Sequence, residues 1–289
     1  MLWRLKNKIG YLSLGALALL AFFIWSAVFA QTPKGEVLID FFDVGQGSAV
    51  LINAPNDNQA LIDGGPSDAI LAKLGEALSP FDRRIEILIL THPDADHLSG
   101  LIEVLKRYQV GEILETGIAD SSVAYQEWQA LIEQKKIPVV FAHFGQTVKI
   151  ADNLSISILY PFGEISGRDF GDNTNSTSII AKLNYGENSF LFTGDAEGSV
   201  EAPLLGSNLN LQADILQVAH HGSKNATGEE FLSVVAPKEA VIQVGAKNPY
   251  GHPTQEVLAR LKDKNINTWR TDLSGDIEFM CNLQQCAKK

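Results

Sequence analysis

The sequence predicts an α+β protein, a four-layer αββα sandwich in which two β-sheets pack together and helices cover their outer faces. Short apolar strands separated by turns come first in the chain, and units of a strand and a helix follow. No segment rich in Pro, Gly or Ser divides the two parts. We therefore expect one domain over residues 34–289, with its site at the edge of the sandwich.

The first half of this domain begins with three short strands and continues with alternating helices and strands. We expect its strands at Val37–Asp43, Ser48–Asn53, Gln59–Asp63, Ile85–Leu90, Glu112–Thr116 and Pro138–Ala142. We expect its helices at Ser67–Leu78, Leu98–Tyr108 and Ser121–Gln134.

The second half also alternates short strands and helices, without repeating the sequence of the first half. We expect its strands at Leu154–Tyr160, Ser178–Leu183, Ser189–Thr193, Asp214–Ala219 and Ala240–Val244, followed by two closing strands. We expect its helices after Asp195 and at Gly228–Val235 and Pro253–Lys262.

Residues 1–33 differ from the rest of the chain. Arg4, Lys6 and Lys8 precede an apolar stretch from Tyr11 to Ala30, and roughly 20 apolar residues suffice for a helix to cross a bilayer. The basic residues should stay in the cytoplasm, which places the domain on the extracytoplasmic side of the cell membrane. A signal peptide cleaved near Ala30, which would release a secreted protein, is the alternative, and a buried core helix is a third reading.

Charge and cysteine content limit the kinds of function. The net charge of −11 argues against a broad basic surface for duplex DNA. It does not exclude a nucleic acid bound at a metal centre, because cations there reverse the local sign of the field. Cys281 and Cys286 lie near the C-terminus, far in sequence from the other candidate ligands. Outside the cytoplasm they could form a disulfide or remain two unpaired thiols.

The densest group of candidate metal ligands follows the strand at 85–90. His92, Asp94, Asp96 and His97 lie within six residues of one loop. Imidazole and carboxylate groups at the end of a rigid strand can converge on a divalent cation. A solvated surface loop is the alternative, although two His and two Asp so close together are unusual in one.

Two later strands also end in candidate ligands. Asp195 is the first charged side chain after an apolar strand, where a carboxylate can bridge two metal ions or cap a helix. His220 and His221 follow another strand, and adjacent residues point in different directions. We therefore expect one of them to bind metal and the other to serve the substrate or support the ligands, with Lys224 close enough to meet an anionic substrate.

Three weaker candidates complete the set. Asp43 and Asp63 each precede glycines and could support the site or simply form turns. His252 lies beside Pro253 and could reach the same centre, although a lone histidine is more often structural.

Six motifs in order resemble the metallo-β-lactamase superfamily, and more closely the hydrolase domain at the C-terminus of the ComEC competence proteins. They are DVGQG (Asp43–Gly47), LIDGG (Leu61–Gly65), THPDADH (Thr91–His97), TGD (Thr193–Asp195), HHGS (His220–Ser223) and YGHP (Tyr250–Pro253). The resemblance covers about Val37–Phe279 and implies an αββα sandwich with a hydrolytic metal centre, usually of zinc or manganese.

The chain also departs from the superfamily pattern. Asp94 stands where the superfamily loop has a second histidine, as it does in the ComEC-like branch. The next metal histidine of the superfamily has no counterpart, and DNTNSTS (Asp172–Ser178) instead resembles an Asn-rich motif of that branch, with Asn175 and Ser178 the best matches. Fewer imidazoles and more oxygen ligands shift the preference toward Mn²⁺ or Mg²⁺.

These observations predict a hydrolase with one or two divalent ions. The expected ligands are His92, Asp94, Asp96, His97, Asp195 and one of His220 and His221. The ions would lower the pKa of a bound water, so that hydroxide attacks a phosphodiester. By resemblance, Asp96 would also orient that water. The groups expected to stabilise the developing oxyanion are Asn175, Ser178, Ser223 and Lys224.

The ComEC-like resemblance implies a nuclease that acts on DNA outside the cytoplasm, including single-stranded DNA, and no obligate protein partner is inferred. The alternatives are a phosphodiesterase of envelope polymers, similar to phosphorylcholine esterases, and a lactone or ester hydrolase. A further alternative is an envelope binding module whose metal is only structural, in which the coordination shell would be closed.

Overall fold

The computed structural model of the chain describes residues 14–23 and 35–289. A compact unit, Val37–Lys289, separates from a preceding unit, Met1–Glu36, in which residues 14–23 are helical. Across the described ranges, no helix combines the length and apolar character needed to cross a bilayer. The predicted membrane-spanning helix is therefore not confirmed, and its basic flank and the cleavage site at Ala30 lie outside the described residues.

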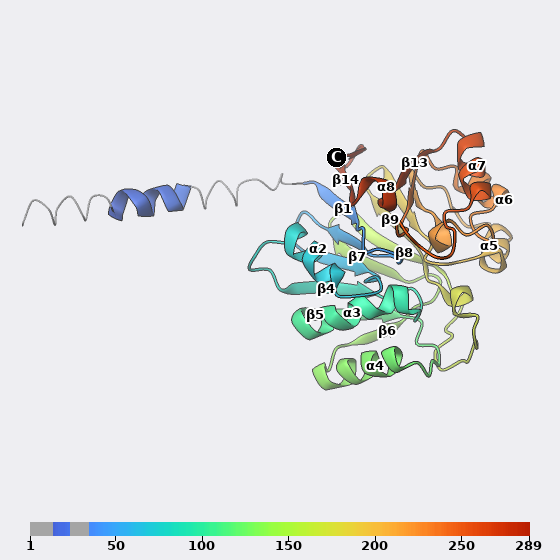
Figure 1. Cartoon of the computed structure of the whole chain (residues 1–289), viewed down its shortest axis with the longest axis horizontal. Helices are drawn as coiled ribbons and strands as arrows, with labels where there is room; N and C mark the ends of the chain where they lie inside the picture. Colours follow the sequence, from blue (N-terminus) through green and yellow to red (C-terminus); the bar gives the residue numbers. More distant parts are fainter. Residues whose placement is uncertain (1–13, 24–34) are drawn as a thin grey trace, which may run out of the picture. The chain divides into compact units, whose positions relative to one another are not determined.

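Two β-sheets form the larger unit (Figure 1). The strands of the first are β1 (Val37–Phe41), β2 (Val50–Asn53), β3 (Gln59–Ile62), β4 (Arg84–Ile89), β5 (Gln109–Glu115), β6 (Val139–Phe141), β14 (Ile277–Cys281) and β15 (Cys286–Lys288). Those of the second are β7 (Thr147–Ala151), β8 (Leu154–Tyr160), β9 (Ile180–Tyr185), β10 (Asn188–Phe192), β11 (Ile215–Gln217), β12 (Glu239–Ile242) and β13 (Asn267–Arg270).

Both sheets are mixed. The first has the order β15-β14-β1-β2-β3-β4-β5-β6, antiparallel up to β3 and parallel from β3 to β6. The second has the order β13-β12-β11-β10-β9-β8-β7, parallel from β13 to β10 and antiparallel beyond. Each half of the chain thus contributes a set of hairpins and a set of strand–helix crossovers, because parallel neighbours need a long connection.

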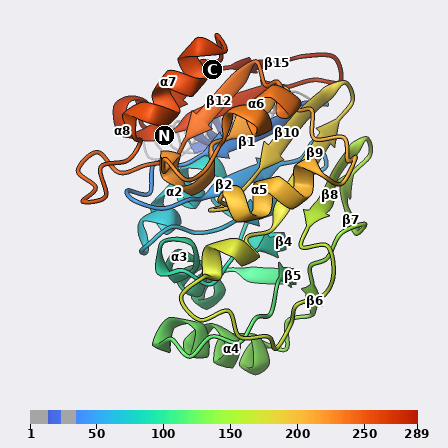
Figure 2. The same ribbon diagram turned by 90° about the vertical axis from the view of Figure 1, so that its right-hand side faces the viewer.

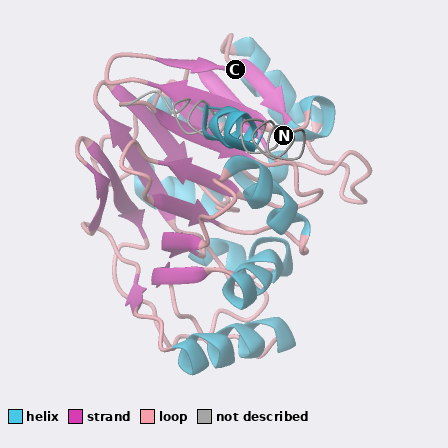
Figure 3. Cartoon of the chain, turned by 90° about the vertical axis from the view of Figure 1, so that its left-hand side faces the viewer, coloured by secondary structure: helices cyan, strands magenta, loops and turns pink. Residues whose placement is uncertain are grey.

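Helices cover the outer face of each sheet. On the first sheet these are α2 (Ala69–Ala77), α3 (Ala95–Arg107) and α4 (Val123–Lys135), and on the second α5 (Gly198–Leu205), α6 (Glu229–Val235) and α7 (Gln255–Asp263). Figures 1 and 2 both place α4 at the end of its layer, next to α3, and Figure 3 distinguishes the helices from the strands of the sheets. Short helices lie at η1 (Thr174–Thr177), η2 (Ala219–Gly222) and α8 (Thr271–Ser274).

The apolar side chains form three cores that match these layers. One core between the sheets includes Phe41, Phe190, Phe192 and Phe279. A second joins the first sheet to α2, α3 and α4, and a third joins the second sheet to α5, α6 and α7. The predicted αββα arrangement of the domain is therefore confirmed, because one core lies between the sheets and one lies under each helical layer.

Two edge strands were not predicted from the sequence. β7 follows a turn and exposes alternate residues to solvent, and β15 has only three residues. Cys281 and Cys286 are opposite each other in β14 and β15 and form a disulfide. Of the two states expected for these cysteines, the structure therefore has the disulfide, which closes the hairpin at the edge of the first sheet.

Asp40 is a buried carboxyl group among other carboxylates in the first sheet. It lies opposite Glu278 in the pairing of β1 with β14. Burial, then Glu278 and then Asp276 raise its pKa to about 7, against an opposing effect of Lys289. The folded protein therefore binds this proton more tightly than the unfolded chain does. Its stability should fall as the pH rises from 4 to 7, and the full cost should persist above pH 7.

We expect Asp40→Asn to stabilise the protein at pH 8 by about 2 kcal/mol and to have little effect at pH 4. The asparagine cannot ionise, so the cost that burial imposes on the charged carboxylate disappears. Urea denaturation at the two pH values measures this difference. Asp152→Asn is the control, because Asp152 forms an exposed ion pair with Lys149 and should show no such pH dependence. Equal effects of Asp40→Asn at both pH values would contradict the assignment.

Candidate metal centre

The loop between β4 and α3 carries the first candidate ligands. Helix α3 begins at Ala95, three residues before the predicted start at Leu98, so Asp96 and His97 lie in its first turn. Asp94 occupies the N-cap position but makes no capping hydrogen bond with its side chain. Its Oδ1 accepts a 2.5 Å hydrogen bond from the Thr174 hydroxyl, and its Oδ2 lies 3.7 Å from His92 Nε2. Helix capping therefore does not explain this carboxylate.

Two glycines let α3 approach the loop after β3. Gly64 N–H donates to the His97 carbonyl at 2.8 Å, and Gly100 N–H donates to the Gly65 carbonyl at 2.9 Å. A Cβ on Gly100 would lie only 1.8 Å from the Gly64 carbonyl oxygen. This close packing places the carboxylate of Asp63, at the end of β3, beside the His97 ring.

Asp63 orients His97. This fully buried carboxylate accepts hydrogen bonds from Thr91 N–H and the Thr91 hydroxyl, both at 2.8 Å, and from His97 Nδ1 at 2.7 Å. The proton on His97 is thereby fixed on Nδ1, and Nε2 is left toward the interior of the cluster. Burial lowers the pKa of His97, but Asp195 and Asp63 outweigh it and raise the pKa well above its ordinary value.

Asp195 lies at the centre of the cluster. Helix α5 begins at Gly198 with Glu197 as its N-cap, so Asp195 is not the helix cap that was the alternative. Its Oδ1 lies 3.2 Å from His97 Nε2, and its Oδ2 lies 3.5 Å from His221 Nε2. Burial raises the pKa of Asp195, but His221 and His97 outweigh it and hold the pKa well below its ordinary value.

A left-handed turn separates the two adjacent histidines. His220, His221 and Gly222 all have positive φ angles, of 48°, 53° and 84°. His221 Nδ1 donates to the Gln243 carbonyl at 2.8 Å, and its Nε2 lies 3.1 Å from Asp96 Oδ2. Burial raises the pKa of Asp96, but the His221 hydrogen bond and the nearby His97 lower it to about 2.

His220 points elsewhere. Its Nδ1 lies 2.9 Å from Glu197 Oε1, and its Nε2 is 3.8 Å from Asp195 Oδ2. Its side chain is 23% exposed, whereas that of His221 is 3% exposed. Of the two histidines, His221 therefore lies in the cluster and His220 lies at its solvent side.

Four side chains could together hold a metal ion. One donor atom from each lies within 4.8 Å of the others, and the four residues are Asp96, His97, Asp195 and His221. His97 Nε2 and Asp195 Oδ1 are buried and make no well-directed hydrogen bond with any group in the described ranges. Buried polar atoms are costly without a partner, so a cation between these donors fits the residues that the chain provides.

His92 and Asp94 lie beside this group. The His92 and His97 rings are 4.2 Å apart. His92 Nδ1 is 3.1 Å from the Thr91 hydroxyl, and its buried Nε2 has no hydrogen-bond partner among the described residues. Burial and then the charge of His97 lower the pKa of His92. Its neutral ring thus also presents an unpaired nitrogen, which is the form that binds metal.

The residues predicted to contact a substrate lie in different environments. Ser178 is fully buried, and its hydroxyl accepts from Asp195 N–H at 3.1 Å. Ser223 is also buried, and its N–H donates to the His220 carbonyl at 2.8 Å. The Ser178 contact supports the backbone of Asp195, and the oxyanion role of both serines stays a prediction. Asn175 Nδ2 lies 3.5 Å from His220 Nδ1, and Lys224 is exposed.

Asp43 and His252 lie outside the four-residue group. The Asp43 carboxylate accepts from Gly45 N–H at 3.1 Å and so forms the turn that was its alternative interpretation. The loop that it begins nevertheless contacts the cluster, because Ser48 N–H donates to the Asp96 carbonyl at 3.2 Å. The His252 ring lies 5.6 Å from the His220 ring.

Sequence reasoning missed three supporting residues. Glu197 holds His220, Thr174 holds Asp94, and the Gln243 carbonyl holds His221. Glu197 is two residues after Asp195, and Thr174 lies in the polar DNTNSTS stretch, so each had a local signal. No sequence signal indicated Gln243, because it acts through its backbone carbonyl, which every residue has.

Comparison with known proteins identifies the family. The family model described as Metallo-beta-lactamase superfamily matches residues 42–246. The chain belongs to this superfamily. Among curated relatives, this superfamily member is 32% identical over 266 residues to ComE operon protein 3 of Bacillus subtilis (strain 168) and 30% identical over 249 residues to Competence protein ComA of Neisseria gonorrhoeae. Each match covers 86% of this chain and 33% of the relative, so the chain spans about a third of their length.

Among solved structures, CmlA, a diiron beta-hydroxylase from Streptomyces venezuelae, matches with a TM-score of 0.53 and 15% identity. The match covers 87% of this chain and 55% of CmlA. At this level of identity, the likeness concerns the fold alone.

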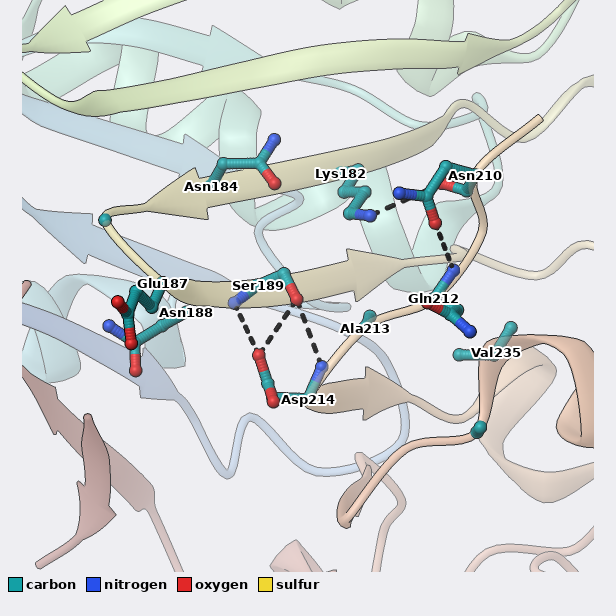
Figure 4. Close-up of a pocket in the computed structure, with 12 residues that line it drawn as sticks. Lys182, Asn184, Glu187, Asn188, Ser189, Asn210, Gln212, Ala213, Asp214 and Val235 are labelled. Atoms are coloured by element: carbon teal, nitrogen blue, oxygen red, sulfur yellow. Dashed lines mark hydrogen bonds between the residues drawn. The ribbon is translucent and has the colours of Figure 1, made fainter. Parts of the chain in front are cut away.

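A polar pocket of about 420 Å³ lies away from the metal cluster of this superfamily member (Figure 4). It is lined by Lys182 of β9 and by Ser189 and Asp214, which lie at the ends of β10 and β11 opposite to those that lead to Asp195 and His221. Lys182 donates to the Asn210 carbonyl at 3.3 Å, and Asp214 accepts from Ser189 and Lys238. The pocket has no histidine and does not belong to the metal centre.

Proposed function

We propose that the protein is a divalent-metal-dependent phosphodiesterase that acts on DNA outside the cytoplasm. The observation that carries this proposal is the group Asp96, His97, Asp195 and His221, whose donor atoms converge, and in which the buried His97 Nε2 and Asp195 Oδ1 have no hydrogen-bond partner among the described residues. Membership of a hydrolase superfamily supports the reaction class. The names of the relatives, among them Competence protein ComA, support DNA as the substrate.

Seven side chains would hold or adjoin one or two divalent ions. These are His92, Asp94, Asp96, His97, Asp195, His221 and, at the solvent side, His220. Such ions supply activation of water near neutral pH and stabilisation of the charge that develops on a phosphoryl group. The mixture of imidazoles and carboxylates suits zinc or manganese, and the share of oxygen donors also admits magnesium.

The chain fixes the proton on each buried imidazole. Asp63 holds the proton of His97 on Nδ1, the Gln243 carbonyl does so for His221, and the Thr91 hydroxyl lies next to His92 Nδ1. All three rings therefore keep Nε2 for a cation. Ser178 acts indirectly in this proposal, because its hydroxyl accepts from the backbone of Asp195 and positions that carboxylate.

The groups left for the substrate are at the solvent side of the cluster. Glu197 orients His220 through Nδ1, which leaves His220 Nε2 to face a bound phosphodiester. Asn175, which neighbours His220, and the exposed Lys224 are available for the anionic oxygens. Together they would bind the phosphate and orient its leaving oxygen.

An extracytoplasmic location has one support within the domain. Cys281 and Cys286 form a disulfide, and disulfides persist mainly in oxidising compartments. The net charge of −11 is compatible with this proposal, since the cations at the centre, rather than a basic surface, would attract the substrate.

Assays of the metal-reconstituted full chain test the proposed function. We expect Mn²⁺- or Zn²⁺-dependent hydrolysis of bis-p-nitrophenyl phosphate and of single-stranded DNA, and none of a lactone. His92→Ala should reduce the phosphodiester turnover by about tenfold or more, because it removes a buried ring nitrogen from the cluster. His143→Ala is the matched control, since His143 bonds to the Phe144 carbonyl outside the centre. Lactone hydrolysis alone, or turnover without metal, would contradict the proposal.

A further inference from the structure

Tyr250 is an exposed aromatic residue on the loop between β12 and α7. Its side chain is 67% exposed. Its ring stacks on that of His252, with centroids 6.0 Å apart and an angle of 27° between the planes. Most of the Tyr250 side chain is therefore in contact with solvent.

The loop beneath this pair is held in place by Asn248. The Asn248 side-chain amide donates to the carbonyls of Gly245 and His252 at 2.9 and 2.7 Å. Its oxygen accepts from the backbone N–H groups of Tyr250 and His252 at 3.2 and 3.0 Å. This half-buried amide thus ties the backbone of the loop through four hydrogen bonds, so the segment that carries the two rings is ordered before any ligand binds.

A series of rings connects this pair to the metal centre. The His252 ring meets the His220 ring edge to face, with centroids 5.6 Å apart. His220 Nε2 in turn lies 3.8 Å from Asp195 Oδ2. A strand whose phosphodiester lies at the centre would therefore carry a neighbouring nucleoside past His252 and Tyr250.

We propose that Tyr250 and His252 form a stacking platform for an unpaired base of a single-stranded nucleic acid substrate. This inference rests on the proposed phosphodiesterase function and specifies its substrate as a single strand. Stacking of bases on aromatic rings is tolerant of sequence, because every base has a π face. It therefore gives a protein of net charge −11 a way to hold a polyanion that does not depend on many phosphate contacts.

Binding measurements test the platform without requiring hydrolysis. The probe is a fluorescein-labelled phosphorothioate oligothymidylate, compared with an abasic phosphorothioate strand of the same length, in fluorescence anisotropy titrations of the full chain with Mn²⁺. We expect Tyr250→Ala to weaken binding of the thymidylate strand by about tenfold or more. The same variant should bind the abasic strand as the parent protein does.

Two further variants separate stacking from other effects. Tyr250→Phe keeps the ring and should bind the thymidylate strand within about twofold of the parent protein. Phe81→Ala removes an equally exposed ring, 72% exposed, near the start of β4 at the end opposite to the metal loop, and should change neither affinity.

Three results would overturn the platform: no preference of the parent protein for the base-bearing strand, unchanged binding by Tyr250→Ala, or equal weakening of both strands. Turnover of bis-p-nitrophenyl phosphate by the same preparations judges the proposed function separately. A parent protein that hydrolyses this small diester but binds both strands alike is a phosphodiesterase without the platform. A parent protein that prefers the thymidylate strand but hydrolyses no diester contradicts the proposed function and leaves the platform standing.

Discussion

Asp195→Asn should remove the bound divalent metal and reduce phosphodiester turnover by about a hundredfold or more. The change keeps the shape of the side chain but replaces a carboxylate whose two oxygens lie 3.2 Å from His97 and 3.5 Å from His221. An amide carries no charge to attract a cation and presents one acceptor oxygen instead of two. Metal analysis of the purified variant and turnover of bis-p-nitrophenyl phosphate measure the two effects.

Asp214→Asn is the matched control for this substitution. Asp214 precedes β11 and bonds to Ser189 in the polar pocket (Figure 4), and it also bonds to Lys238. The residues that line this pocket include none of the four that could hold the metal. Its amide variant should keep both metal and turnover. Full metal content and turnover in Asp195→Asn would show that Asp195 does not hold the metal and that the centre is built around other donors.

Gly100→Ala should destabilise the protein by about 3 kcal/mol or more, or prevent its folding. The added Cβ would lie 1.8 Å from the Gly64 carbonyl oxygen, and both partners are backbone that cannot rotate away. Helix α3 would have to move from the loop that holds Asp63, so His97 would lose its partner as well. Urea denaturation of the metal-free protein measures the change in the free energy of unfolding.

Gly75→Ala provides the same substitution in a neighbouring helix. Gly75 lies in α2, and an added Cβ there meets nothing within 4 Å. This variant should be more stable than the parent protein by about 0.5 to 1 kcal/mol, because alanine loses less backbone entropy in a helix. If both variants gained stability alike, the contact of α3 with the Gly64 loop would not be tight in solution.

The local parts of this fold could be predicted because they have short-range signals. Apolar strands such as 85–90 and 188–192 end in His92 and Asp195, and the change from apolar to polar residues marks each position. The loop of His92, Asp94, Asp96 and His97 was dense enough to indicate a metal centre before the strands could be arranged. The edge strands β7 and β15 were missed because half-exposed or very short strands carry no comparable apolar run.

The directions of side chains could not be predicted, because they depend on backbone angles. His220 and His221 are equivalent in the sequence, and only the positive φ angles of both residues turn His221 into the cluster and His220 toward Glu197. Ser178, predicted to stabilise the oxyanion, is fully buried with its hydroxyl on the backbone N–H of Asp195, a contact that the sequence did not indicate. Such contacts join residues far apart in the chain, and no local pattern records them.

Strand β1 determines how the domain can be attached to a support. The strand enters the sandwich at Val37, opposite Cys281, and ends at Phe41, from which the chain passes into the loop whose Ser48 contacts Asp96. The two ends of the strand are about 13 Å apart, at 3.3 Å for each residue. A resin or sensor surface coupled N-terminal to Val37 would therefore attach the domain at the end of β1 that lies away from the metal centre. Immobilised protein should then keep its centre accessible to long, soluble strands.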